Sequence, residues 1–204
     1  LEPMTIPPSE TTLVHLFAER VRESGDLPAL HVKLQGTFTT LTWSQIGDRV
    51  RKTAAGLQAI GIKPGDRVVQ FAENHFQWIV CDIAIQMARA IHVPVHAPLA
   101  GQQVIDQALD CEASAIIVSD HAQANKLKCK IDRLPKSVRF VSFKPDVRKI
   151  GRRQVTPLSE LRQLTDDKVQ AAVQQTALEE LGPNSLATIL RRPTMTSRNA
   201  SKGE

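Results

Sequence analysis

The apolar residues at the start of the chain follow two different periods, which predict a β-hairpin and then a helix. Residues 29–41 hold two runs of apolar and β-branched side chains separated by a Gln-Gly pair, which is typical of two strands joined by a turn. Between residues 43 and 60 the apolar positions recur every three or four residues, as on one face of a helix. Thr42 and Gln45 indicate a capping box where that helix begins, and Gly61 indicates its end.

The same alternation of strand and helix patterns continues to residue 190. Asn74, followed by Gln77 three residues later, is the predicted N-cap of the next long helix, and Ser119 or Asp120 that of a shorter one. The strand that contains Pro94 should be short, because proline cannot donate to a central ladder. The predicted strands are residues 67–72, 91–95, 115–118, 138–141 and 185–190, and the further predicted helices are residues 75–88, 102–109, the stretch after 120, 158–164 and 168–181.

Strands that alternate with helices predict an α/β fold with a mainly parallel sheet and right-handed crossovers. The continuous apolar run at residues 115–118 is expected of a strand covered on both faces. Residues 144–157 are polar and basic without a period, so we expect a mobile loop there. Helical or strand periodicity places the following side chains in the predicted core: Trp43, Ile46, Val50, Leu57, Val68, Phe71, Ile79, Ile83, Ile116 and Ile117.

The composition is that of a soluble globular protein. The 204 residues, 42% of them hydrophobic and 23% charged, are enough for one full domain. No run of about 18 apolar residues predicts a membrane-spanning helix, and residues 1–10 lack the basic and apolar regions of a signal peptide. The chain has an odd number of cysteines, and they are widely spaced, at Cys81, Cys111 and Cys129. This pattern favours free thiols in a reducing, cytoplasmic compartment.

The positive charge of the chain is concentrated in two segments. The net charge is +5, but residues 126–153 carry +9 and residues 191–204 carry +3, so the rest of the chain is net −7. This distribution argues against the uniform basic surface of a nucleic-acid-binding protein. The segment 126–153 is most simply a solvated charged surface, and the alternative is a peripheral contact with anionic membrane or a phosphate-bearing ligand.

Known catalytic and nucleotide-binding motifs are missing from the sequence. There is no GxGxxG, HExxH or GxSxG, and the stretch nearest to a P-loop, residues 56–63, lies at a helix C-terminus, which repels phosphate. His92 and His96 would share one face of a strand, which is one arrangement of a metal pair. Without a carboxylate or cysteine nearby in sequence, two structural histidines are the stronger interpretation.

Five segments nevertheless form an ordered set between residues 41 and 190. They are L-T-W-S-Q-I at 41–46, G-I-K-P-G-D-R-V at 61–68, an E-N-x-x-x-W pattern at 73–78, V-P-V followed by P-L at 93–99, and S-L-A-T-I-L at 185–190. In their order and spacing they resemble the N-terminal region of the adenylate-forming superfamily, particularly long-chain fatty-acyl-CoA synthetases. One departure lies within this region, because Arg89 stands where the family usually has glycine.

The larger departure follows residue 190, where the family has a Thr/Ser/Gly-rich loop that ends in lysine. Backbone N–H groups and hydroxyls of such a loop cradle the phosphates of ATP. Thr196-Ser197 and Lys202-Gly203 echo it, but the glycines between them are missing. We therefore expect residues 191–204 to be an aberrant, basic and disordered tail that arose from a frame change or truncation.

The resemblance divides the chain into a flexible N-terminus at 1–11, the N-terminal part of an acyl-CoA synthetase domain at 12–190, and the tail at 191–204. It implies that intact relatives use ATP and Mg²⁺ to convert a fatty acid to an acyl-adenylate and then transfer the acyl group to CoA. No catalytic, cofactor-binding or metal-binding residue carries over, so this fragment is expected to be inactive alone and to bind no cofactor. The alternatives are a non-catalytic module that binds a partner or lipid through residues 126–153, and a non-functional gene remnant.

Overall fold

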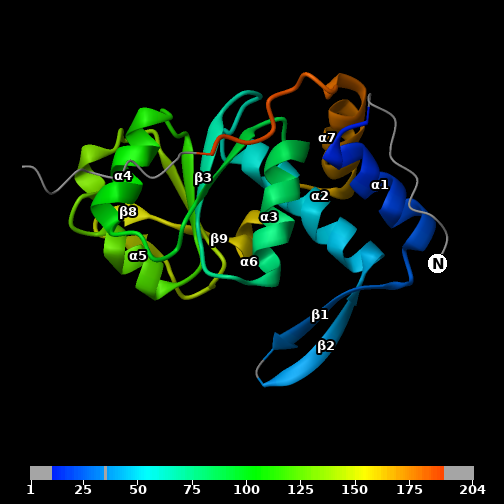
Figure 1. Ribbon diagram of the computed structural model, residues 1–204, viewed down its shortest axis with the longest axis horizontal. Coiled ribbons are helices and arrows are strands. Elements are labelled where there is room, and N and C mark those ends of the chain that lie inside the picture. Colours follow the sequence, from blue (N-terminus) through cyan, green and yellow to red (C-terminus); the bar gives the residue numbers. More distant parts are fainter. Residues whose placement is uncertain (1–10, 35, 191–204) are drawn as a thin grey trace, which may run out of the picture.

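The computed structural model describes residues 11–34 and 36–190, which form an α/β fold (Figure 1). The elements in chain order are α1 (Leu13–Ser24), β1 (Pro28–Leu34), β2 (Thr37–Thr42), α2 (Trp43–Ala59), β3 (Arg67–Phe71), α3 (Phe76–Met87), β4 (Ile91–Val95), α4 (Gly101–Asp110), β5 (Ala115–Val118), α5 (His121–Leu127), the 3-10 turn η1 (Ile131–Arg133), β6 (Arg139–Ser142), β7 (Lys149–Ile150), β8 (Arg153–Gln154), β9 (Thr156–Pro157), α6 (Leu158–Leu161) and α7 (Asp167–Glu180). None of the described helices is long and apolar enough to cross a membrane.

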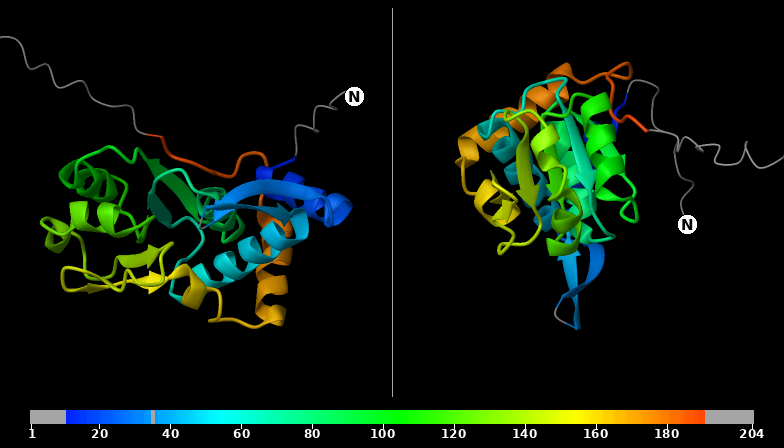
Figure 2. Two further views of the ribbon diagram at one scale, coloured as in Figure 1. Left: turned by 90° about the horizontal axis from the view of Figure 1, so that it is seen from below. Right: turned by 90° about the vertical axis from the view of Figure 1, so that its left-hand side faces the viewer.

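Five parallel strands form the central sheet in the order β4-β3-β5-β6-β9, which confirms the predicted α/β class. Successive side chains of β5 point to opposite faces, and all of them are buried. Ile117 joins a core formed with α1, α2, α3 and α7, while Ile116 joins a second core formed with α4 and α5. Figure 2 shows the sheet between these two layers of helices. The hairpin β1–β2 projects from the body as a separate antiparallel ribbon.

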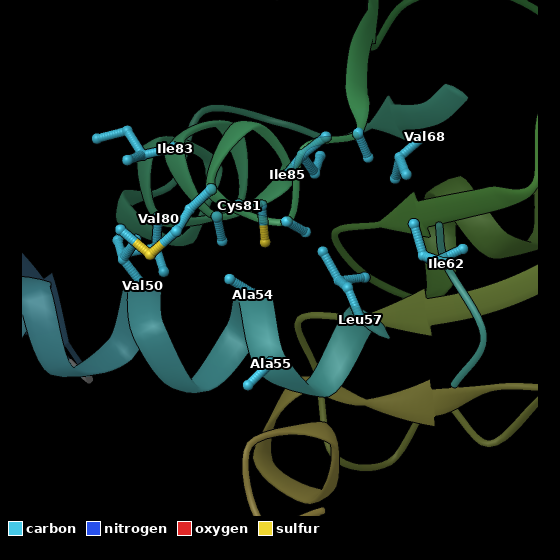
Figure 3. Close-up of a cluster of buried hydrophobic side chains, with 14 of the residues drawn as sticks. Val50, Ala54, Ala55, Leu57, Ile62, Val68, Val80, Cys81, Ile83 and Ile85 are labelled. Carbon is cyan, nitrogen blue, oxygen red and sulfur yellow. The ribbon is translucent and has the colours of Figure 1, made fainter. Parts of the chain in front are cut away.

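Small side chains bring α2 and α3 close together over the sheet (Figure 3). Ala54 of α2 faces Cys81 of α3, and both are fully buried. Most of the predicted core is confirmed, since eight of its ten side chains are buried. Trp43 is half-buried, and Ile79 is 42% exposed. The prediction for Ile79 is wrong because it lies at the rim of a 390 Å³ hollow between α1 and α3, which no described side chain fills.

Three other sequence predictions are also wrong. Residues 144–157 contain the antiparallel pair β7–β8 instead of a mobile loop, and buried Ile150 anchors it. Residues 185–190 form no strand but a single bridge, between Thr188 and His92, because His92 is the one described strand residue whose backbone bonds them. The α3 helix begins after His75, not Asn74, and the His75 ring accepts a hydrogen bond from the N–H of Gln77 at 3.2 Å.

Pro94 lies on an edge strand, as its missing N–H requires. His92, two residues earlier in β4, bonds residues 187–189 at the outer edge of the sheet. Its backbone N–H donates to the carbonyl of Ala187, and its carbonyl accepts from the N–H of Ile189. Residues of a parallel strand alternate in the side to which their backbone groups point. The nitrogen of Pro94, two residues on, therefore faces the outer edge of the sheet.

Two residues at helix ends, Gly101 and Arg89, stand in positions that favour glycine, one because of a close contact and the other because of its φ angle. A Cβ atom on Gly101 would lie 1.8 Å from the carbonyl oxygen of Lys126, so only glycine allows α4 to approach the end of α5 this closely. Arg89, directly after α3, has a φ of 62°, in the left-handed region that favours glycine. Its guanidinium forms an ion pair with Glu180 of α7. The structure thus gives a physical reason to expect glycine at this position.

We expect Gly101→Ala to lower the free energy of unfolding by about 2 kcal/mol, because main-chain atoms must move to admit the methyl group. Urea denaturation measures the change. Gly182→Ala is the matched control, since no atom lies within 4 Å of its added Cβ and its φ is not positive. Equal unfolding midpoints for the two variants would show that the α4–α5 approach is not tight.

Arg89→Gly should be more stable than Arg89→Ala by about 1 kcal/mol, because both lose the ion pair but only glycine relieves the positive φ. The same denaturation experiment compares them. Glu180→Gln measures the ion pair alone and should cost less than about 1 kcal/mol, because Glu180 is largely exposed. If Arg89→Ala were as stable as Arg89→Gly, the left-handed backbone would carry no strain.

Candidate functional site

The strand order places a candidate site between the carboxyl ends of β3 and β5. The chain passes from β3 to β4 on one side and then returns to β5 on the other, so the strand order reverses between β3 and β5. Open parallel sheets bind ligands in the crevice at such a point. The relevant residues here are those that follow Phe71 and Val118.

A polar network joins the two loops at this position. The Ser119 hydroxyl accepts from the backbone N–H of Glu73 at 3.2 Å and donates to a carboxylate oxygen of Asp120 at 2.9 Å. The side-chain amide of Gln123 donates to the Glu73 carboxylate at 2.8 Å. The second oxygen of Asp120 caps α5 by accepting from the Gln123 N–H at 3.0 Å.

The network links the two loops through the protein's own groups. Gln123 and Ser119 are 1% and 5% exposed, whereas Glu73 lies at the surface. Ser119 is engaged by an amide and a carboxylate, and no described histidine hydrogen-bonds to it, so it lacks the adjacent base that activates a serine nucleophile. One buried group stays open, because Oε1 of Gln123 has no hydrogen-bond partner among the described residues. The arrangement holds two loops together but assembles no recognisable catalytic set.

His75 stands beside this network, and sequence reasoning missed its role. Its ring packs against Phe76 and Phe143, with centroids 4.7 and 5.8 Å away. Partial burial, and then the cation of Lys144, lower the pKa of His75 below its usual value. A neutral ring leaves Nδ1 free to accept the Gln77 N–H, which is the bond that caps α3.

The structure separates the two histidines that the sequence placed on one strand face. His92 is buried within β4, and its Nδ1 lies 2.8 Å from a carboxylate oxygen of Asp82 on α3. Its ring also meets Trp78 edge-on at 5.2 Å. His96 follows the strand and is exposed. Within residues 11–34 and 36–190, no three His, Cys, Asp or Glu side chains are grouped as metal ligands.

The segment that would lead to a phosphate loop runs along the outer edge of the sheet. Ala187 and Ile189 bond the backbone of His92 at 2.9 and 3.0 Å, which directs the chain past β4 toward residue 191. The possible loop residues Thr196-Ser197 and Lys202-Gly203 lie outside the described residues. The expected disorder of residues 191–204 also falls outside them, as does the expected flexible N-terminus at 1–11 apart from Thr11.

A family model described as AMP-binding enzyme matches residues 17–190. A long-chain-fatty-acid–CoA ligase of Mycobacterium bovis is 27% identical over 122 residues, which cover 60% of this chain and 20% of that protein. Another, from Xenopus laevis, is 24% identical over 186 residues, covering 91% of this chain and 25% of the relative. The chain thus spans about a quarter or less of the length of these relatives.

Solved structures of acyl-CoA ligases share the fold. A long-chain-fatty-acid CoA ligase from Rhodopseudomonas palustris matches with a TM-score of 0.62 and 20% identity, over 78% of this chain and 37% of that one. Coronafacic acid ligase from Pectobacterium brasiliense matches with a TM-score of 0.65 and 16% identity, over 75% and 29%. Because both identities are low, these likenesses bear on the fold alone.

The three free cysteines should differ sharply in reactivity at pH 8. Burial raises the pKa of Cys81 to about 12 and also raises that of Cys111, whereas Cys129 is exposed. Only the thiolate attacks a disulfide reagent, and roughly one Cys81 in ten thousand is ionised at this pH. We expect one fast thiol per native chain with Ellman's reagent, and all three in denaturant. A fast phase that persists in Cys129→Ser would contradict this order.

Proposed function

Because the chain belongs to the AMP-binding enzyme family, we propose that it forms the N-terminal part of a long-chain fatty-acid–CoA ligase. The observation that carries the proposal is the match over residues 17–190, together with relatives named as long-chain-fatty-acid–CoA ligases. The whole protein would use ATP, with Mg²⁺, to activate a fatty acid and would then form the thioester with CoA. The corresponding domain boundaries are 12 and 190, with residues 1–11 and 191–204 outside the domain.

Residues 12–190 would serve this reaction as a scaffold. The Ser119–Glu73–Gln123 contacts fix the loops at the switch point, and β4 guides residues 187–189 along the sheet edge. The switch-point loops do not suit the phosphates of ATP, because they carry the carboxylates of Glu73 and Asp120, whereas a triphosphate needs cations or N–H donors. We therefore assign these residues no step in adenylation.

The cytoplasm is the proposed location. The three cysteines of the chain are unpaired, which suits a reducing compartment. Fatty acid and CoA, as partners of the whole enzyme, are part of the same proposal and draw their support from the names of the relatives.

We expect a chimera to carry the ligase activity that we do not expect of the isolated chain. Residues 12–190 would replace the matching segment of the Xenopus laevis ligase, and palmitoyl-CoA formation would be measured. The chimera should form the thioester above a mock preparation. The chain alone should form none, and calorimetry with ATP–Mg²⁺ should show no saturable binding beyond that of inorganic triphosphate.

Two outcomes would count against the proposal. One is a chimera that is folded by circular dichroism and binds CoA but makes no thioester. The other is turnover, or ATP-specific binding, by the isolated chain, which would mean that residues 191–204 form a nucleotide loop despite their missing glycines.

A further inference from the structure

Lys128, Lys130, Lys149 and Arg152 gather at one corner of the molecule, and we propose that this basic corner binds the anionic surface of a lipid bilayer. The inference is independent of the ligase proposal, since it rests on charge and packing around α5 and the β7–β8 hairpin. It narrows the broad positive segment 126–153 to four exposed cations carried by residues 128–130 and 149–152, the two stretches that meet at the hairpin tip.

Four other cations of the segment are already occupied within the protein, and three more, Lys136, Arg139 and Lys144, are exposed but lie outside residues 128–131 and 149–152. Lys126 donates to the carbonyl of Ala97 at 2.8 Å, and Arg133 pairs with Asp106 at 2.7 Å. Arg148 pairs with Glu160. Arg153 donates to the backbone carbonyls of residues 134, 135, 136 and 138, and its guanidinium lies over the ring of Phe140. These side chains stabilise the fold and contribute little to a docking surface.

Packing brings the free cations together. Gly151, at the tip of the β7–β8 hairpin, has a φ of +58°, and a Cβ there would lie 3.4 Å from the Ile131 side chain and 3.9 Å from the Lys128 carbonyl. The hairpin tip therefore rests on residues 128–131. Ile150 is buried, so Lys149, its neighbour in the strand, points outward. Figure 1 places α5 and β8 in the same region of the molecule.

The charge of the corner is only weakly offset. Lys128, Lys130, Lys149 and Arg152 are exposed, and none forms an ion pair with a described residue. Asp132 is the one acidic residue within residues 128–133. The other acidic residue of the segment 126–153, Asp146, is bound by His121 at the first residue of α5, with 3.2 Å between Nε2 of the histidine and the carboxylate oxygen.

The character of the corner favours lipid head groups over a protein surface. The centres of protein interfaces are apolar and depleted in lysine. None of the large exposed hydrophobic side chains of the described residues falls within residues 126–153. Three of the four cations are lysines, which are mobile point charges without the bidentate geometry that selects one phosphate group. A diffuse layer of anionic head groups suits such a surface, and attraction of this kind amounts to about fivefold in affinity per cation.

The experiment is sedimentation of the 204-residue chain with phosphatidylcholine vesicles that contain phosphatidylserine, and with phosphatidylcholine vesicles alone. We expect binding only to the anionic vesicles at low ionic strength, and release at high salt, because the attraction is screened. Inorganic phosphate or glycerophosphoserine at equal ionic strength should not displace the protein more than chloride does. Displacement by either at low concentration would overturn the bilayer assignment in favour of a small phosphate site.

Two variants of equal charge locate the site. The corner variant combines Lys128→Gln, Lys130→Gln and Lys149→Gln. It should bind vesicles at least about tenfold more weakly, because each lost cation alone weakens binding about fivefold. The control variant combines Lys33→Gln, Lys63→Gln and Lys168→Gln, which removes three exposed lysines outside the corner. It should bind vesicles almost as the parent chain does. Both variants keep the cations of residues 191–204, and urea unfolding checks that both are folded.

Three results would overturn the proposal. Equal loss in the two variants would mean that net charge, not the corner, drives binding. Full binding by the corner variant would place the contact elsewhere. No binding of the parent chain to anionic vesicles, together with corner-dependent binding to polyglutamate, would assign the corner to an acidic protein surface instead.

Discussion

Burial of the central strands on both faces is the constraint on which the rest of the structure depends. Every side chain of β5 is buried, and successive residues enter two different cores. A strand of this kind needs a layer of helices on each side, because neither face can be left to water. The close approaches follow from this demand. Gly101 lets α4 meet the end of α5, and Ala54 and Cys81 let α2 and α3 pack together over the sheet.

Local signals explain why much of the fold could be predicted from the sequence. Thr42 and Gln45 form the expected capping box, and the apolar run at residues 115–118 is indeed a strand covered on both faces. The failures have a common cause. Ile150 is buried where the β7–β8 hairpin packs near Ile131, and Ile79 is exposed because no described side chain fills the hollow beside α1. Neither fact is a property of the local pattern.

The polar contacts at the candidate site were beyond sequence reasoning for the same reason. Gln123 meets Glu73 across 50 residues of chain, and His92 finds Asp82 on the facing side of a helix. Such pairs depend on which strands become neighbours, and a single sequence does not record that. One unusual feature of the structure could be anticipated from the sequence. Arg89 departs from a family pattern of glycine, and its left-handed backbone is the physical basis of that pattern.

The position of Pro94 has a consequence for how the protein behaves among other copies of itself. His92 uses both of its backbone groups on residues 187 and 189, so the next outward-facing position of β4 at which a strand of another chain would need an N–H donor is Pro94. Proline lacks that donor, so sheets from two molecules join there less readily. The edge of β4 can thus bond residues 187–189 of its own chain, while Pro94 keeps it from starting intermolecular β-aggregation.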